Sequence, residues 1–291
     1  MTRGGAGYET VSPESAATLV ASGEALVLDV RNPEEWTHLG TIPGAVALPM
    51  DLALSATATL PRDGRPILVC CEHGVRSAAV ARMLAAAGLP RVLNLAGGMS
   101  RWSGERAFDA RTPDARYGPS SWLLANVDLL PAGGGAGSPP AMLDVASGAG
   151  RHALLLASAG FAVRAIDVDA GRLSTLRTTA AALGLGLDAD PIDLEAGEAD
   201  LGADRYDLIL VIRYLHRPLF PALRRALRPG GVLLYETFTR EQAARGRPTD
   251  PAHLLEPGEL QRLVAPLAIV RERAGEFDGG MVAGVAARRD A

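Results

Sequence analysis

Short aliphatic runs alternate with alanine-rich segments along most of this chain, and the alternation predicts an α/β architecture. Between residues 25 and 102 the aliphatic runs are "ALVLDV", "AVALP", "PILVCC" and "RVLNL". From Ala141 onward they are "AMLDV", "AVRAIDV", "YDLILVI", "GGVLLYETF", "LAIVRER" and "GMVAGVAARR". Strands separated by helices pair in parallel sheets. The last two runs have no helical segment between them, so we expect them to form an antiparallel hairpin.

One stretch interrupts this alternation and divides the chain. "PAGGGAGSPP", residues 131–140, is rich in glycine and proline and predicts a flexible joint. A chain of 291 residues is long enough for two domains, each with its own core. We expect a first domain over residues 8–102, a linker over 103–118 and a second domain over 119–291. "PSSWLLANVDLL", residues 119–130, has helical spacing and is predicted to form a helix that covers the second domain.

Composition excludes several classes of protein. The 29 basic and 33 acidic residues leave a net charge of -4, so no nucleic-acid partner is expected. The longest apolar runs are about half of the ~20 residues that a membrane span needs, and "MTRGGAGYET" has no signal-peptide core. We expect a cytoplasmic protein with no membrane partner, whereas its oligomeric state is not predicted. Two adjacent cysteines provide neither a disulfide framework nor a zinc site, so no metal is expected.

The adjacent cysteines raise the question of which one is the nucleophile. Counted from Cys70, the spacing to Arg76 is C-x5-R, which is typical of a phosphatase loop; counted from Cys71 it is C-x4-R, which is typical of a sulfurtransferase loop. "ILVC" fits a strand buried on both faces, so Cys70 is predicted to end the strand and Cys71 to start the loop. Gly74 also stands three residues after Cys71, the usual place of the loop glycine. Backbone N–H groups and the start of the following helix are therefore expected to converge on the Cys71 sulfur and to stabilise an anion there.

Four motifs in order make residues 10–102 resemble a single rhodanese-family domain. They are "LVLDVRNPEEW", "GTIPGAVALP", "CEHGVRS" and "LAGGMSRW", and Thr41 stands where the family usually has histidine. The resemblance implies a parallel sheet with flanking helices and a cysteine that carries a sulfane sulfur as a persulfide. The implied site residues are Cys71 as the persulfide carrier, Arg76 as the anion-binding cation, Glu72, His73, Gly74 and Val75 as the persulfide loop, and Asp29 with Arg31 as a supporting charge pair. Cys70, Trp36 and Trp102 are expected to be packing residues.

Two nucleotide-binding folds compete for the glycine-rich turn in "AMLDVASGAGRHALLLASAGFAVRAIDVDAGRL". Read as G-x-G-x-x-A from Gly148 to Ala153, with Asp167 as a ribose-binding acid, the segment satisfies the dinucleotide fingerprint. Three features favour S-adenosylmethionine instead. Asp144 precedes the turn and would repel a pyrophosphate, "PIDLE" offers Asp193 to an adenine amino group, and the predicted C-terminal hairpin is antiparallel. Ala146 replaces the usual first glycine, which predicts a less unusual backbone angle there.

Together these features make residues 119–288 resemble class I S-adenosylmethionine-dependent methyltransferases, and "VIRYLHRPLFPALRRALRPGGVLLYETF" resembles the tellurite-resistance-like, small-molecule branch. The resemblance implies a Rossmann-like seven-stranded sheet that ends in the antiparallel hairpin. It also implies S-adenosylmethionine as the cofactor. The implied cofactor-binding residues are Asp144, Ser147, Gly148 and Gly150 for the methionine moiety, Asp167 for the ribose hydroxyls, Asp193 and Leu194 for the adenine, Arg213 at the methyl-transfer centre, and Val168. Tyr214, His216 and Arg247 are the candidate substrate contacts.

The sequence therefore predicts a bifunctional enzyme: a sulfurtransferase that uses a Cys71 persulfide, fused to a methyltransferase. Its partners would be a small-molecule sulfur donor and a methyl acceptor, either a thiol or sulfide or a metalloid compound. A second hypothesis makes the first domain a sensor or docking module whose thiol state controls the methyltransferase. A third keeps the dinucleotide fingerprint and predicts an NAD-dependent oxidoreductase, against which Asp144 argues.

Overall fold

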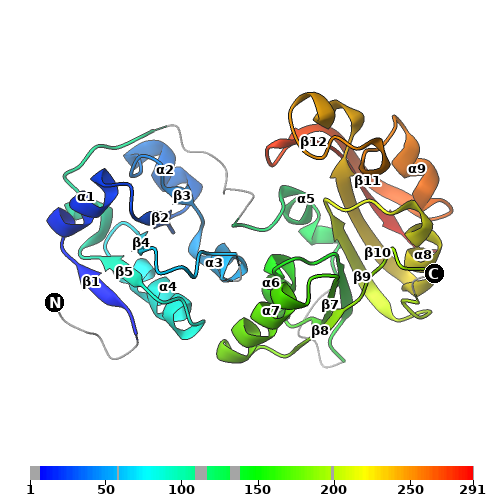
Figure 1. Ribbon diagram of the computed structural model, residues 1–291, viewed down its shortest axis with the longest axis horizontal. Helices are drawn as coiled ribbons and strands as arrows, with labels where there is room; N and C mark the ends of the chain where they lie inside the picture. The colour runs from blue at the N-terminus through cyan, green and yellow to red at the C-terminus, as the bar shows by residue number, and fades with distance from the viewer. Residues whose placement is uncertain (1–6, 58, 109–116, 132–137, 198–199, 291) are drawn as a thin grey trace. The chain divides into compact units, whose positions relative to one another are not determined.

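The computed structural model describes residues 7–57, 59–108, 117–131, 138–197 and 200–290 (Figure 1). The chain divides into two compact units, and the main boundary along the chain lies between Gly118 and Pro119. The glycine-rich joint falls largely outside the described residues, as does the centre of the linker predicted over 103–118. No helix in the described part of the chain is both long enough and apolar enough to cross a membrane.

The first unit is a five-stranded parallel sheet with flanking helices, as predicted. Its strand order is β1-β5-β4-β2-β3, so β4, which leads to the cysteines, is central. In Figure 1, α4 lies beside β4 and β5. The elements of this unit are β1 (Glu9–Val11), α1 (Pro13–Ala21), β2 (Leu26–Asp29), α2 (Pro33–Leu39), β3 (Val46–Ala47), η1 (Met50–Leu52), α3 (Ala53–Ala56), β4 (Ile67–Cys70), α4 (Val75–Ala86), β5 (Val92–Leu95) and η2 (Gly98–Arg101).

The core of this unit explains why β4 is a continuous apolar run. A strand in the middle of a parallel sheet packs on both faces, and all four residues of β4 are buried. Trp36 and Trp102 are 1% and 7% exposed, which agrees with their prediction as packing residues. Strand β1 was not among the predicted runs, because it contributes only three residues, "ETV", at the sheet edge.

The second unit is a seven-stranded mixed sheet in the order β11-β12-β10-β9-β6-β7-β8. Strands β6 to β10 run parallel, while β12 pairs antiparallel with β10 and β11 with β12, which confirms the predicted hairpin. The strands are β6 (Ala141–Val145), β7 (Ala162–Asp167), β8 (Leu187–Pro191), β9 (Tyr206–Ile212), β10 (Leu227–Phe238), β11 (Ala268–Phe277) and β12 (Gly280–Arg288). The helices are α6 (Arg151–Ser158), α7 (Ala170–Ala182), η4 (Arg217–Leu219), α8 (Phe220–Ala226), η5 (Arg240–Ala244), η6 (Pro251–His253) and α9 (Glu259–Val264).

The helix predicted over residues 119–130 is much shorter than expected. It comprises α5 (Ser121–Leu124) and a separate 3-10 turn, η3 (Val127–Leu129). The Asn126 side chain donates a hydrogen bond of 2.7 Å back to the carbonyl of Trp122, and asparagine used in this way competes with the helical ladder. The segment is nonetheless anchored to the second unit, because the N–H of Ser120 donates to His152 Nε2 at 3.0 Å.

Candidate functional sites

The Cys71 sulfur is the focus of the loop between β4 and α4. It accepts hydrogen bonds from the backbone N–H groups of Gly74 at 3.1 Å and Ser77 at 3.3 Å, and the Ser77 hydroxyl lies 3.3 Å away. The N-cap of α4, Gly74, has a φ of 84°, a conformation that favours glycine. Donors that converge on one sulfur at the start of a helix stabilise a thiolate. The Ser77 hydroxyl in turn donates to the side-chain oxygen of Asn94 at 2.6 Å, and neither residue was predicted to belong to the site.

Gly98, on the segment that follows β5, allows that segment to lie directly against the backbone of the cysteine loop. Gly98 has a φ of 64°, and a Cβ at this position would stand 2.1 Å from the carbonyl oxygen of Cys71. The next two residues donate backbone hydrogen bonds to the loop, from Met99 to Cys71 at 2.8 Å and from Ser100 to Glu72 at 2.9 Å. The segment after β5 that carries the motif "LAGGMSRW" therefore holds the cysteine loop in place by backbone hydrogen bonds.

The two cysteines face opposite sides of the sheet. Cys70 packs in the cluster that contains Leu68 and Leu93, whereas Cys71 belongs to the cluster that contains Val80 and Leu84. Complete burial is the largest cause that raises the pKa of the Cys70 thiol well above its ordinary value. A thiol held protonated in an apolar cluster is a poor nucleophile, so the geometry favours Cys71.

Charged side chains surround this loop in two groups. In the first, the fully buried Arg31 bonds both Asp29, at 2.8 Å, and Glu72, at 2.9 Å. Thr41 completes it by donating to Asp29 at 2.6 Å, so the residue that replaces the family histidine supports this ion pair. In the second group, Arg76 pairs with the carboxylate of Glu35 on α2. His73 and Val75 are exposed, and His73 Nδ1 lies 3.4 Å from the Ser100 hydroxyl.

The glycine-rich turn of the second unit follows β6. Gly148 and Gly150 have φ values of 56° and 77° and lead into α6. The expectation for Ala146 is wrong, since its φ is 52°, within the left-handed region that the replaced glycine would adopt at no cost. An alanine there costs about 1–2 kcal/mol relative to an ordinary conformation.

Two buried polar groups, one near the end of β6 and one in this turn, have no hydrogen-bond partner among the described residues. They are Oδ2 of Asp144, a residue 2% exposed, and Oγ of Ser147. Unsatisfied buried groups are costly, and at a strand end they indicate a place for a polar ligand. Burial raises the pKa of the Asp144 carboxyl from 3.8 to about 7, and the nearby Arg151 guanidinium opposes this shift.

The pKa of Asp144 predicts how stability depends on pH. Between about pH 4 and 7 the native state binds a proton at Asp144 that the unfolded chain has released, so this group lowers the free energy of unfolding as pH rises through that window. The contribution has a slope of up to about 1.4 kcal/mol per pH unit. We expect Asp144→Asn to remove it. Urea unfolding of both proteins across this window tests the expectation, and parallel stability curves would contradict it.

The expected ribose and adenine residues lie at neighbouring strand ends. Both carboxylate oxygens of Asp167 accept backbone N–H groups, from Gly148 at 2.8 Å and from Asp169 at 2.9 Å, so this acid ties the turn to the end of β7. After β8, Leu194 is buried and Asp193 is exposed. Val168 is 67% exposed. These residues border the carboxyl ends of adjacent parallel strands, where ligands bind in open α/β sheets.

Arg213 is held at the carboxyl end of β9 in a strained conformation. Its φ is 60°, its N–H donates to the carbonyl of Glu236 at 2.7 Å, and its guanidinium bonds the carbonyl of Asp278. The guanidinium also lies over the ring of Phe238, 5.2 Å from its centroid. A strained residue fixed by several partners at a strand end is typical of a functional site.

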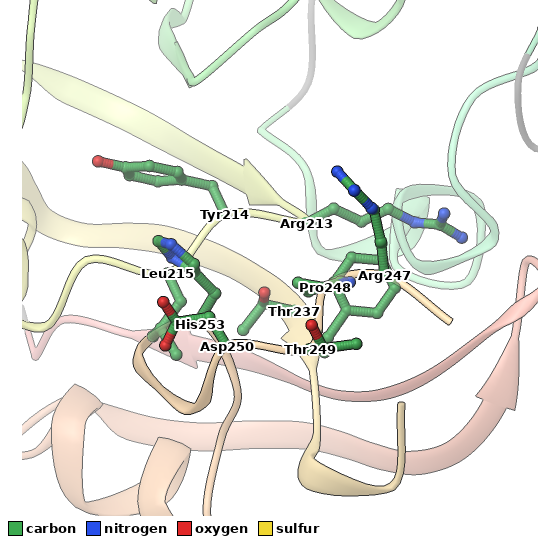
Figure 2. Close-up of a pocket in the computed structure, with 10 residues that line it drawn as sticks. Arg213, Tyr214, Leu215, Thr237, Arg247, Pro248, Thr249, Asp250 and His253 are labelled. Carbon is green, nitrogen blue, oxygen red and sulfur yellow. The ribbon is translucent and has the colours of Figure 1, made fainter. Parts of the chain in front are cut away.

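A pocket of about 550 Å³ opens beside Arg213. Its lining includes two of the three candidate substrate contacts, Tyr214 and Arg247, but not His216. His253 lines it instead and was not predicted, because "AHLL" carries no motif. Figure 2 shows the guanidinium groups of Arg213 and Arg247 on one side of the pocket and the rings of Tyr214 and His253 on the other. The volume suits a small molecule.

These features define a two-domain α/β protein with a cysteine at the centre of a loop in one domain and a glycine-rich turn after the first strand of the other. Residues 12–105 match the family model of the rhodanese-like domain, and residues 142–231 match that of a methyltransferase domain. The chain therefore belongs to the rhodanese-like family through its first domain and carries a methyltransferase domain in its second. Both families agree with the resemblances found in the sequence.

Curated relatives match the first domain. A sulfurtransferase of Allochromatium vinosum is 36% identical over 94 residues, which cover 32% of this chain and 86% of the relative. The thiosulfate sulfurtransferase GlpE of Actinobacillus succinogenes is 30% identical, with 33% and 84% covered. The probable adenylyltransferase/sulfurtransferase MoeZ of Mycobacterium tuberculosis is 36% identical over 97 residues, but the chain spans only 24% of its length.

Solved structures resemble the second domain at low identity. An S-adenosylmethionine-dependent methyltransferase from Mesorhizobium loti has a TM-score of 0.47 and 21% identity, and the match covers 59% of this chain and 99% of that one. TehB from Haemophilus influenzae has a TM-score of 0.47 and 17% identity, with 58% and 61% covered. The tellurite-resistance-like branch remains a prediction.

Proposed function

We propose that this protein is a bifunctional transferase, in which Cys71 carries sulfur as a persulfide and the second domain transfers a methyl group from S-adenosylmethionine to a small molecule. The observation that supports the first activity is the convergence of two backbone N–H groups on the Cys71 sulfur. The observation that supports the second is the pair of unpartnered polar groups, Asp144 and Ser147, at the glycine-rich turn.

In the first domain, the loop would hold the reacting sulfur of Cys71 by backbone donors. The Cys71 thiolate attacks the outer sulfur of a sulfane donor, the S–S bond of the donor breaks, and its electron pair leaves with the rest of the donor. The N–H groups of Gly74 and Ser77 then donate to the Cys71 persulfide. Because Cys71 is only 1% exposed, the persulfide would be shielded from water until an acceptor docks.

In the second domain, the residues present fit the cofactor. Asp144, ionised by the cationic end of S-adenosylmethionine, and Ser147 would hold the methionine moiety, while Asp167 would hold the ribose hydroxyls. The cofactor supplies an electrophilic methyl group on a sulfonium. The pocket beside Arg213 would align the acceptor, a thiol, sulfide or metalloid compound. Methyl transfer to such nucleophiles depends mostly on alignment and exclusion of water, so a dedicated base is not required.

Calorimetry tests the cofactor proposal against the oxidoreductase hypothesis. We expect S-adenosylmethionine and its demethylated product to bind, and NAD and NADP to give no heat. In the protein without ligand the pKa of Asp144 is about 7, so near neutral pH part of this carboxyl is protonated. The cationic ligand favours the ionised form, so binding should release protons. Titrations in buffers of different ionisation enthalpy measure that release. Tighter binding of NAD than of S-adenosylmethionine would contradict the proposal.

A further inference from the structure

We infer that the Cys71 loop takes its sulfur from an alkyl persulfide, and that Glu35 disfavours the dianion thiosulfate by neutralising Arg76. The inference rests on the proposed persulfide function of Cys71 and names the class of its donor. It follows from the ion pairs around the loop, in which each arginine bonds at least one carboxylate of the same domain.

Arg76 is the cation nearest in sequence to the loop, and it is paired. Its two terminal nitrogens donate to the two carboxylate oxygens of Glu35, at 2.7 and 2.5 Å. The Asn32 N–H donates to Glu35 at 3.0 Å in a capping box at the start of α2, which fixes the carboxylate in place. A two-pronged pair of this kind is a strong arrangement for arginine, and the pair as a whole carries little net charge to attract a second anion.

Arg31, the second cation, has more hydrogen-bond partners than Arg76 and is more deeply buried. Its guanidinium donates to Asp29, to Glu72 and to the carbonyl of Gly40, and its side chain is fully buried. Glu72 is itself a loop residue, and its carboxylate adds a negative charge next to Cys71. The ion pairs at this loop therefore join three carboxylates to two guanidinium groups. Two further arginines lie outside these pairs. Arg101, which lies across Gly97, is exposed, where a charge has a weaker effect, and Arg106 donates to the backbone carbonyls of Leu39 and Met99.

The two donor classes place different charges at this loop. With thiosulfate, the Cys71 thiolate bonds the outer sulfur, the S–S bond breaks and its electron pair leaves with sulfite, itself a dianion. With an alkyl persulfide R–S–S–H, the thiolate bonds the outer sulfur and the S–S bond breaks towards R. The products are the protonated Cys71 persulfide and the thiolate R–S⁻, which carries one charge. Ion pairs that hold more carboxylates than guanidinium groups oppose the first reaction more than the second.

The experiment compares two probes on the full chain: thiosulfate and the persulfide of 2-mercaptoethanol, whose carbon body is uncharged. Rapid quenching and peptide mass spectrometry give the rate of sulfur addition to Cys71. We expect Glu35→Gln, which keeps the capping acceptor but frees Arg76, to raise the thiosulfate rate about five- to tenfold and to change the persulfide rate less than about twofold. Because each donor is compared between variants, its intrinsic reactivity cancels.

Glu34→Gln is the matched control, since Glu34 is the exposed neighbour on the same helix and its side chain has no part in the loop. We expect it to change neither rate. Wild-type protein supplies a second measurement: added salt should speed loading by thiosulfate, because it screens repulsion. An unchanged thiosulfate rate in Glu35→Gln, or slower wild-type loading at high salt, would overturn the inference. Loading of neither donor onto Cys71 would instead refute the proposed persulfide function.

Discussion

Cys71→Ser is expected to abolish sulfur loading, whereas Cys70→Ser should keep most of it. The difference follows from the register of the loop. The Cys71 sulfur accepts the N–H groups of Gly74 and Ser77, while Cys70 lies in an apolar cluster on the opposite face, where burial raises the pKa of its thiol. Serine is close in size to cysteine, so neither change opens a large cavity.

Peptide mass spectrometry after treatment with a sulfane-sulfur donor checks this result. Thermal unfolding of both variants is the control, because equal midpoints would show that lost loading is a chemical effect. Sulfur found on Cys70 alone would contradict the assignment. Phosphatase activity without sulfur transfer would favour the C-x5-R alternative instead.

Asp167→Ala is expected to weaken the binding of S-adenosylmethionine by about 1.5–3 kcal/mol, through the loss of charge-assisted hydrogen bonds to the ribose. Part of this effect would come from the turn, because the Asp167 carboxylate also accepts the N–H of Gly148. Asp167→Asn separates the two contributions, since the amide retains one acceptor oxygen but no charge. We expect an intermediate affinity from it, measured by calorimetry.

Asp190→Ala is the matched control for this measurement. Asp190 stands on β8, the strand next to Asp167, but its carboxylate pairs with Arg164 and is 45% exposed. A partly exposed ion pair contributes little, so this change should leave both the affinity and the stability nearly unaltered. Equal affinities for the Asp167 variants and the wild type would remove Asp167 from the proposed cofactor site.

Local patterns predicted much of the architecture. The apolar run before Cys71 and the position of Gly74 placed the end of β4 and the start of the loop, because strand burial and turn conformation depend on neighbouring residues. The C-terminal hairpin was predictable for the same reason. The helix over residues 119–130 was not, because the side-chain contact of Asn126 with Trp122 ends it early.

Features that depend on distant residues were not predicted. Glu35 and Arg76 are 41 positions apart, and only the packing of α2 beside the loop joins them, so the ion pair between them was not part of the prediction. Ala146 adopts the left-handed backbone conformation although alanine disfavours it, because the surrounding turn imposes that conformation. His253 reaches the pocket through a segment that no motif marks.

Native mass spectrometry of the full chain, treated with an alkyl persulfide and then mixed with S-adenosylmethionine, tests the two proposed activities most directly. We expect a covalent gain of one sulfur atom per chain, located on Cys71 by fragmentation, together with one non-covalently bound S-adenosylmethionine. A chain that gains no sulfur at Cys71 and binds no S-adenosylmethionine would contradict it.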